Sequence, residues 1–334
     1  MNGQLGVSFF FVLSGYLITY LLLKEKNNFG KINISYFYMR RILRIWPLYF
    51  LILFIGFLLI PILTGYRGSV YTQKDLYVFF LGNFDLVKNG VGNFITSILW
   101  SVSVEEQFYL IWPLLLSAVP LKHLAKFLIL LIILSVCYRI FGIGGKSFDL
   151  RISYHTFSCL YNMAVGGLLA YLLNTGSLLN KIEKLHKFTI INIYIIGWTL
   201  LFMRSDILKW EEAESTYLKS ILPVIYALFF AFIIAEQVYA QNSFFKLGRI
   251  MLLNKLGKIS YGLYCYHMLS LFIVFQILTE LKFNTSNQSV PLFTLAVIAS
   301  FVLTVLLSLL SFHFFEKKFL AFKAKFHVTT IQKR

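Results

Sequence analysis

Apolar runs of roughly membrane-spanning length follow one another along this 334-residue chain. A helix that crosses a lipid bilayer needs about 20 predominantly apolar residues. Only 13% of the residues are charged, whereas a soluble domain carries about 25%. We therefore predict an all-α polytopic integral membrane protein with about nine transmembrane helices, and the composition excludes a soluble enzyme. The predicted helices cover residues 5–23, 42–63, 100–119, 127–143, 159–173, 188–203, 218–240, 259–281 and 290–315.

The excess of positive charge collects on one side of the predicted membrane. The formal net charge is +17, and it falls on one set of alternate connections when segment 24–44 is placed in the cytoplasm. The connections on the other side carry no net charge. This separation follows the positive-inside rule and places the C-terminus in the cytoplasm. A nucleic-acid partner is not expected, because the bases lie in short connections between apolar runs rather than on a soluble face.

The succession of apolar runs is irregular in two places. Residues 76–84 are apolar but too short to span, and we interpret them as an interfacial or re-entrant segment. Nine spans with a cytoplasmic C-terminus leave the N-terminus outside, although nothing before Leu5 resembles a signal sequence. We therefore expect one more helix ahead of these in the complete unit.

No metal-binding pattern is visible in the sequence. The three cysteines, Cys137, Cys159 and Cys265, are isolated and lie in or beside apolar runs. This spacing predicts neither a disulfide framework nor a metal site. No pair of histidines has metal-ligand spacing, so we predict no bound metal.

Five motifs place polar or charged groups inside or beside apolar runs. They are Gly6-x-x-x-Phe10-Phe11-x-x-Ser14-Gly15-Tyr16-Leu17-Ile18, Arg40-Arg41-x-x-Arg44-x-x-Pro47, Trp100 to Tyr109 with Trp112-Pro113, Ser260-Tyr261-x-x-Tyr264-x-x-His267, and Glu316-Lys317. In this order they resemble the acyltransferase-3 family of integral membrane acyltransferases, of the O-antigen and exopolysaccharide O-acetyltransferase type. The resemblance implies a membrane-embedded acyltransferase domain over residues 1–320 and a short basic cytoplasmic tail over residues 321–334.

The resemblance also implies parts that this sequence lacks. Family members begin with another helix, which carries an arginine near its start and, near its end, a histidine proposed as the catalytic base. This sequence begins at the second helix of the family unit, which has about ten. We therefore expect little activity from the chain as written, and activity to return when such a helix is restored. Cys159 and Tyr161 stand where many relatives have arginine and aspartate.

Three arginines form a compact basic group at the start of the second apolar run. Arg41 and Arg44 are three residues apart and share a helix face, and Arg40 is four residues from Arg44. Guanidinium groups suit phosphate oxygens because they present paired donors. The resemblance implies that this group holds acyl-CoA, most simply acetyl-CoA, as a donor substrate and not as a permanently bound cofactor. The alternative is ordinary positive-inside anchoring, which needs no ligand.

Two adjacent carboxylates, Glu105 and Glu106, lie inside an apolar run. A charged carboxylate at the bilayer centre costs roughly 2.5–3.5 kcal/mol, so at least one should be paired, protonated or exposed to a watery cavity. Adjacent helix positions point about 100° apart, so the two are expected to face different groups. The functional interpretation is that one of them orients a catalytic imidazole or binds a sugar acceptor. The alternative is a structural salt bridge to an intramembrane base such as Arg139.

His267 is the best-placed imidazole in the chain for proton transfer. It lies about two turns into the 259–281 run, and Tyr264 and Ser260 share its face. The alternative is a hydrogen-bonded core histidine. His155, in a predicted outer loop, is a further candidate for contact with the acceptor.

Ser14, Trp100, Tyr264 and His155 complete the candidates for the substrate region. A nucleophilic role for Ser14 would need a base within hydrogen-bond reach. Ser14 and Gly15 are better explained by close helix packing, since small residues let backbones approach in lipid.

The resemblance implies acyl transfer from cytoplasmic acyl-CoA to a hydroxyl of a cell-surface or exported carbohydrate, in the inner membrane of a bacterium. The main alternative is a transporter of polysaccharide or lipid-linked sugar, and a third possibility is an inactive assembly protein. Transporters tend to show internal repeats and matched broken helices. No repeat is visible, and we expect the prolines near helix ends or in loops.

Overall fold

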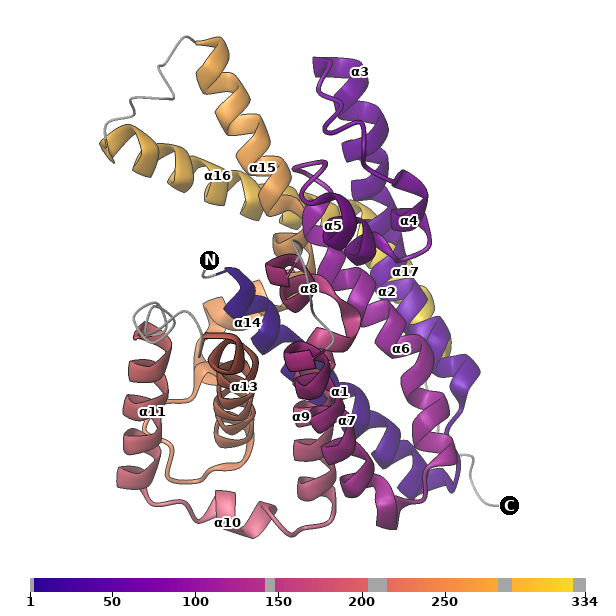
Figure 1. Ribbon diagram of the computed structural model, residues 1–334, viewed down its shortest axis with the longest axis vertical. Coiled ribbons are helices and arrows are strands. Elements are labelled where there is room, and N and C mark those ends of the chain that lie inside the picture. Colours follow the sequence, from indigo (N-terminus) through magenta and orange to yellow (C-terminus); the bar gives the residue numbers. More distant parts are fainter. Residues whose placement is uncertain (1–2, 142–147, 204–214, 282–289, 327–334) are drawn as a thin grey trace. The chain divides into compact units, whose positions relative to one another are not determined.

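The computed structural model describes residues 3–141, 148–203, 215–281 and 290–326 (Figure 1). Within these ranges every regular element is helical and no strand occurs. The prediction of an all-α protein is therefore confirmed. Of the predicted tail, residues 321–326 continue a helix, and residues 327–334 lie outside the described part of the chain.

Seven helical segments of the described chain are long and apolar enough to cross a membrane. They are Gly3–Phe29, Ile34–Thr64, Leu121–Phe141, Leu150–Asn174, Tyr217–Tyr239, Ser260–Glu280 and Pro291–Lys323. The other two predicted spans form helices that fall short of this standard. α11 (Lys187–Phe202) has only 16 residues, and Glu105, Glu106 and Gln107 lower the hydropathy of α6 (Trp100–Ala118).

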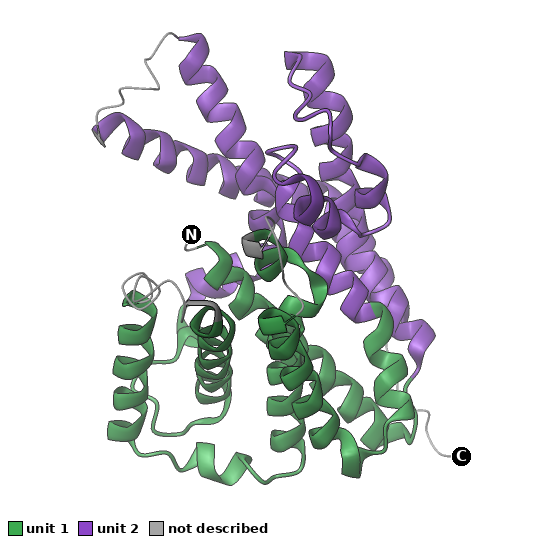
Figure 2. Ribbon diagram, viewed as in Figure 1, with its two compact units in different colours: residues 1–32, 110–250 green, residues 33–109, 251–334 purple. Residues whose placement is uncertain are grey.

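The chain divides into two compact units, each built from two separate stretches of sequence (Figure 2). Unit 1 comprises residues 1–32 and 110–250, and unit 2 comprises residues 33–109 and 251–334, so the chain passes from one unit to the other three times, once within α6. In unit 1 the helices are α1 (Gly3–Phe29), α7 (Leu121–Phe141), α8 (Phe148–Tyr154), α9 (Thr156–Asn174), α10 (Leu179–Glu183), α11, α13 (Ser215–Tyr239) and the second half of α6.

Unit 2 contains the first half of α6 and the remaining helices. They are α2 (Ile34–Phe54), α3 (Ile60–Thr64), α4 (Lys74–Val78), α5 (Gly82–Asn89), α14 (Met251–Lys258), α15 (Ser260–Glu280), α16 (Val290–Ser311) and α17 (Lys317–Lys323). A π-helical turn, Ile55–Leu59, joins α2 to α3, and a second one, Phe312–Glu316, joins α16 to α17. Such turns insert an extra residue into a helix without breaking it and are frequent at functional sites.

Three prolines lie inside helices, so the prediction that they would lie near helix ends or in loops is wrong for them. Pro47 is inside α2, Pro113 inside α6 and Pro223 inside α13. Membrane helices tolerate proline because neighbouring helices and hydroxyl side chains satisfy the backbone groups that it frees. Ser117, for example, donates its hydroxyl hydrogen to the carbonyl oxygen of Pro113 at 2.7 Å.

Helices α1 and α9 of unit 1 meet backbone to backbone through two glycines. A Cβ added at Gly15 would overlap the carbonyl oxygen of Met163, and one added at Gly166 would overlap the carbonyl oxygen of Val12. Close approach of this kind compensates for the weak hydrophobic driving force between helices in lipid. The packing role predicted for Gly15 is therefore confirmed.

Replacing Gly166 with alanine is expected to destabilise unit 1. The new Cβ would overlap the backbone of Val12, which cannot rotate out of the way as a side chain can. Overpacking of this kind typically costs 1–3 kcal/mol, so the Tm of the purified protein should fall. The matched control is Gly257→Ala, because nothing lies within 4 Å of a Cβ added there. Equal Tm values for the two variants would contradict the packing argument.

Candidate functional site

The arginine motif lies on the first half of α2, where Asn33 caps the helix by accepting the N–H of Tyr36. The Arg41 guanidinium is held between two rings, 5.6 Å from the Phe37 centroid and 5.5 Å from that of Tyr109. Its Nε atom is buried and has no hydrogen-bond partner among the described residues. Arg41 is thus fixed in place by stacking, while part of its hydrogen-bonding capacity is unused.

A fourth base, absent from the sequence predictions, joins the three arginines. Lys323 of α17 is subject to electrostatic repulsion from Arg40, Arg41 and Arg44. Arg40 also donates through Nη1 to the carbonyl oxygen of Phe326, 2.9 Å away, which ties the end of the described chain to α2. Four like charges in one place repel one another, and a bound polyanion would relieve that repulsion.

The predicted carboxylates of α6 lie beside this cationic cluster, which comprises Arg40, Arg41, Arg44 and Lys323. Both Glu105 and Glu106 interact electrostatically with Arg41. Glu105 is only 4% exposed. Glu106 accepts the indole N–H of Trp46 through Oε2 at 2.9 Å, and its Oε1 is buried without a hydrogen-bond partner in the described chain. Arg41 therefore supplies a counter-charge for the pair, and one carboxylate oxygen stays free for a further donor.

Arg139, the alternative partner considered for these carboxylates, donates instead to backbone carbonyl oxygens. In unit 1 its guanidinium donates to the carbonyl oxygens of Ile152 at 2.9 Å, Ser158 at 3.2 Å and Lys219 at 2.7 Å. It also lies 5.6 Å from the ring centroid of Tyr161, one of the two positions that depart from the family pattern. Arg139 thus crosslinks α7 to the backbone of α8, α9 and α13.

The short apolar segment between α4 and α5 packs against Trp46. Phe80 has a φ of 56°, and its ring lies 5.3 Å from that of Trp46 and 4.4 Å from that of Tyr49. Gln107 of α6 holds this strained residue by donating to its carbonyl oxygen at 2.8 Å. A non-glycine residue in this conformation costs of order 1–3 kcal/mol and persists only where its surroundings enforce it. The segment predicted to be interfacial or re-entrant therefore supports the Trp46–Glu106 pair.

Burial beside Asp85 affects the neighbouring phenol of Tyr77 in α4. Desolvation, followed by the Asp85 charge, raises the pKa of Tyr77 above its ordinary value. Tyr77 is fully buried, and its carbonyl oxygen accepts the hydroxyl of Tyr49 at 2.6 Å. Tyr77 therefore stays neutral at physiological pH and acts as part of the supporting layer.

Replacing Trp46 with phenylalanine should lower the Tm of the protein. The ring stacking is largely kept, but Glu106 loses the N–H that it accepts. Hydrogen bonds to charged groups contribute about 1.5–3 kcal/mol. Trp198→Phe is the control, because Trp198 of α11 is 47% exposed. The pairing would be shown unimportant if the two variants unfolded at the same temperature.

Helix α15 carries the Ser260-to-His267 motif in the same unit. Tyr261 donates to the carbonyl oxygen of Ile45 at 3.0 Å, and the hydroxyls of Tyr264 and Ser101 are hydrogen-bonded to each other. His267 Nδ1 lies 2.6 Å from the carbonyl oxygen of Tyr264. Because a carbonyl can only accept, Nδ1 carries the hydrogen, and Nε2 of the neutral ring is left as a proton acceptor.

The remaining candidates divide between the two units. Trp100 is buried at the start of α6 in unit 2, and Ser14 is buried in α1 of unit 1. His155 precedes α9 in unit 1, where Nδ1 accepts the N–H of Phe157 at 3.3 Å and the ring stacks on Tyr138 at 4.8 Å. His155 thus has a local capping role. Among the described residues, no group of three or more histidine, cysteine, aspartate or glutamate side chains could hold a metal ion.

The fold and the site together define an all-α polytopic membrane protein that gathers cations and buried carboxylates in one unit with a tyrosine–histidine pair. The chain belongs to the acyltransferase-3 family: the model of that family, described as an acyltransferase domain, matches residues 1–309. The family resemblance of the sequence motifs is thereby confirmed.

Two relatives from Staphylococcus aureus match nearly the whole chain. A protein of strain COL named a putative O-acetyltransferase is 29% identical over 95% of this chain and 53% of its own length. The O-acetyltransferase OatA of strain NCTC 8325 is 30% identical over 94% of this chain and 52% of its own length. The chain thus spans about half the length of the curated relatives it matches. No solved structure matches it.

Proposed function

We propose that this chain is the membrane part of an O-acyltransferase, which moves an acyl group, most simply acetyl, from acyl-CoA to a carbohydrate hydroxyl. Membership of the acyltransferase-3 family and relatives named O-acetyltransferases support the reaction class. The single observation that carries the proposal is the cationic cluster beside Glu105 and Glu106, with His267 in the same unit. The cationic cluster suits the anionic part of a donor, and His267, further along the same unit, suits the proton transfer.

The cationic cluster is our proposed site for the phosphates of the donor. Phosphate oxygens would neutralise the mutual repulsion of the four bases and accept from guanidinium donors. Stacking holds Arg41 in place before any ligand arrives, which lowers the entropic cost of binding. We place this end of α2, and the chain end tied to it, in the cytoplasm of a bacterium, since acyl-CoA is made there.

His267 is the proposed base in the transfer step. The acceptor oxygen attacks the thioester carbonyl carbon, the carbon–sulfur bond breaks, and CoA leaves as the thiolate. The hydroxyl proton passes to His267 Nε2, because Nδ1 already carries the hydrogen bonded to Tyr264. A positioned base of this kind contributes typically 10²–10⁴-fold.

The proposal is tested with membranes from cells that produce the protein naturally, supplied with acetyl-labelled acetyl-CoA. We expect label in an alkali-labile ester on envelope carbohydrate, and no such label after deletion of the gene. Carbohydrate that crosses the membrane without gaining label would instead indicate a transporter and overturn the proposal.

Replacing Arg41 and Arg44 together with glutamine should raise the KM for acetyl-CoA at least tenfold. Two of the four bases that would face the phosphates are lost, and each tenfold change corresponds to about 1.4 kcal/mol. A double variant of exposed bases in α14, Lys255→Gln with Lys258→Gln, changes the net charge equally and should leave KM unaltered. Equal KM values for the two double variants would count against donor binding at the arginines.

A further inference from the structure

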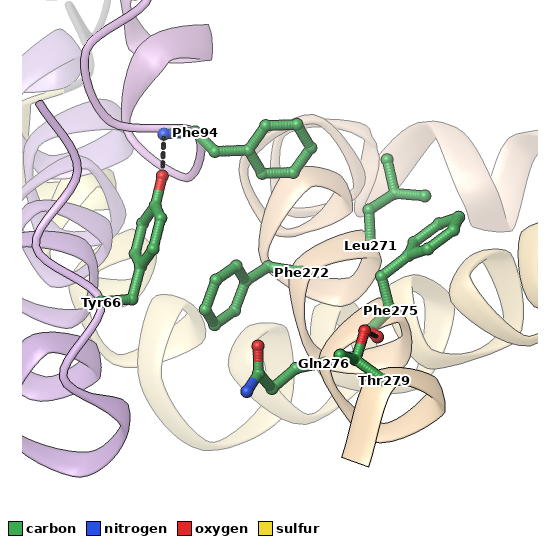
Figure 3. Close-up of a pocket in the computed structure, with 7 residues that line it drawn as sticks. All are labelled: Tyr66, Phe94, Leu271, Phe272, Phe275, Gln276 and Thr279. Carbon is green, nitrogen blue, oxygen red and sulfur yellow. Dashed lines mark hydrogen bonds between the residues drawn. The ribbon is translucent and has the colours of Figure 1, made fainter. Parts of the chain in front are cut away.

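A cavity of about 330 Å³ lies at the far end of α15 within unit 2 (Figure 3). Tyr66 and Phe94, from the segments that follow α3 and α5, line one side. The other side is a single face of α15, formed by Leu271, Phe272, Phe275, Gln276 and Thr279. The volume falls within the roughly 300–1,000 Å³ of small-molecule sites, at the lower end.

The lining combines aromatic faces with neutral polar groups and contains no charge. The rings of Tyr66 and Phe272 lie 4.9 Å apart, and the Tyr66 hydroxyl accepts the backbone N–H of Phe94 at 3.1 Å. That hydroxyl still has its own hydrogen to donate. Gln276 and Thr279 add an amide, which donates one hydrogen to Glu280 Oε1 at 3.3 Å, and a second hydroxyl, which donates to the carbonyl oxygen of Phe275 at 2.9 Å. The absence of charge in the lining disfavours phosphate and ionic peptides, whereas an acyl chain would leave the polar groups unused.

A pyranose ring has the complementary chemistry. It presents one face of C–H groups, which pack on aromatic rings, and an equatorial belt of hydroxyls that need hydrogen-bond partners. Rings such as Tyr66 and Phe272 supply a large apolar surface in fixed positions. Gln276 keeps a second amide hydrogen and its carbonyl oxygen beside the bond to Glu280, and can therefore donate to a sugar hydroxyl or accept from one.

The cavity lies on the same helix as His267, away from the arginines. Tyr261 contacts Ile45, one residue beyond Arg44, at the start of α15, whereas the cavity is lined by residues of its second half. Leu271 is four residues beyond His267 and so lies on its face, about 6 Å further along the axis. A ligand in the cavity would therefore be next to the imidazole and on the opposite side of it from the cationic cluster.

We infer that this cavity is the binding site for one neutral sugar residue of the acceptor, packed against Tyr66 and Phe272 and hydrogen-bonded by Gln276. The inference rests on the proposed function for the choice of a carbohydrate. It places the acceptor at one end of α15 and the donor phosphates at the other, so that the reacting hydroxyl and thioester meet near His267.

The test measures binding separately from catalysis. Radiolabelled neutral oligosaccharides of glucose, galactose, mannose and N-acetylglucosamine are dialysed against the purified protein in lipid nanodiscs. We expect at least one to bind, and its Kd to rise at least tenfold in both Phe272→Leu and Gln276→Leu. Ile277→Leu is the matched control, since Ile277 is 49% exposed on α15 and does not line the cavity. The inference is overturned if none of the sugars binds, or if the variants bind them as the parent does.

A second measurement separates this inference from the proposed function. If a sugar binds through Phe272 and Gln276 but never receives label from acetyl-CoA, the proposed function fails and the binding site stands. If label is transferred with the same acceptor KM in all three variants, the function stands and the binding site fails.

A lipid bearing a photoreactive acyl chain gives the last check. If bound sugar reduces the labelling of the cavity, the inference is supported. If bound sugar leaves the labelling unchanged, the cavity is assigned to lipid.

Discussion

Replacing His267 with glutamine is expected to lower acyl transfer by roughly 10²–10⁴-fold at saturating donor. Glutamine can still hydrogen-bond to its own helix but cannot take up a proton. The KM for acetyl-CoA should stay constant, because the cationic cluster lies on other elements of the unit. Initial rates with labelled acetyl-CoA, in membranes from the native cell carrying the variant gene, measure both quantities.

His313→Gln is the matched control for this substitution. His313 also places Nδ1 near a carbonyl oxygen of its own helix, that of Leu309 at 2.9 Å, but its side chain is exposed. It should retain the full rate. A His267→Gln variant that folds and transfers label as fast as His313→Gln would show that another group takes the proton.

The positions of the reactive groups follow from local sequence. Arg41, Glu105, Glu106 and His267 each lie in a motif whose helix is predicted from an apolar run, and the structure places all four in one unit. The shared faces of Arg41 with Arg44 and of His267 with Tyr264 follow from spacings of three residues. This part of the site can be predicted from the period of a helix and the cost of charge in lipid alone.

The groups that hold them could not be predicted, because they come from distant parts of the chain. Trp46 is 60 residues from Glu106, and Gln107 is 27 residues from the Phe80 carbonyl that it binds. Nothing in the apolar stretch around Phe80 requires a left-handed residue, so its conformation is set by tertiary packing. The only local signal was that this stretch is too short to span.

Arg139 illustrates a second limit. A base inside an apolar run suggests an acidic partner, yet three backbone carbonyls occupy its guanidinium. Carbonyl oxygens occur in every sequence and leave no pattern, so a buried base bound in this way cannot be told from one in a salt bridge. Lys323 was missed for a related reason, since its neighbours lie on α2, far away in sequence.

The two carboxylates are expected to differ sharply when each is replaced by glutamine. In Glu106→Gln the amide oxygen can still accept the Trp46 N–H, and Glu105 remains as the counter-charge of Arg41. We therefore expect a Tm close to that of the parent and a loss of transfer of about 10²-fold or more. The loss follows because the buried Oε1, free of protein donors in the described chain, can no longer hold an imidazole or an acceptor hydroxyl as a charged group.

Glu105→Gln should lower the Tm more than it lowers transfer. Glu105 is almost fully buried, and its charge opposes that of Arg41. Removing one member of a buried ion pair can cost 3–5 kcal/mol, and the nearby Glu106 would reduce that cost. We therefore expect a marked fall in Tm, with substantial transfer per folded molecule. Thermal unfolding and transfer rates, both normalised to folded protein, distinguish the two roles. A Glu105→Gln variant that keeps its Tm but loses transfer would exchange the assignments, because a carboxylate that stabilises Arg41 should show its loss chiefly in stability.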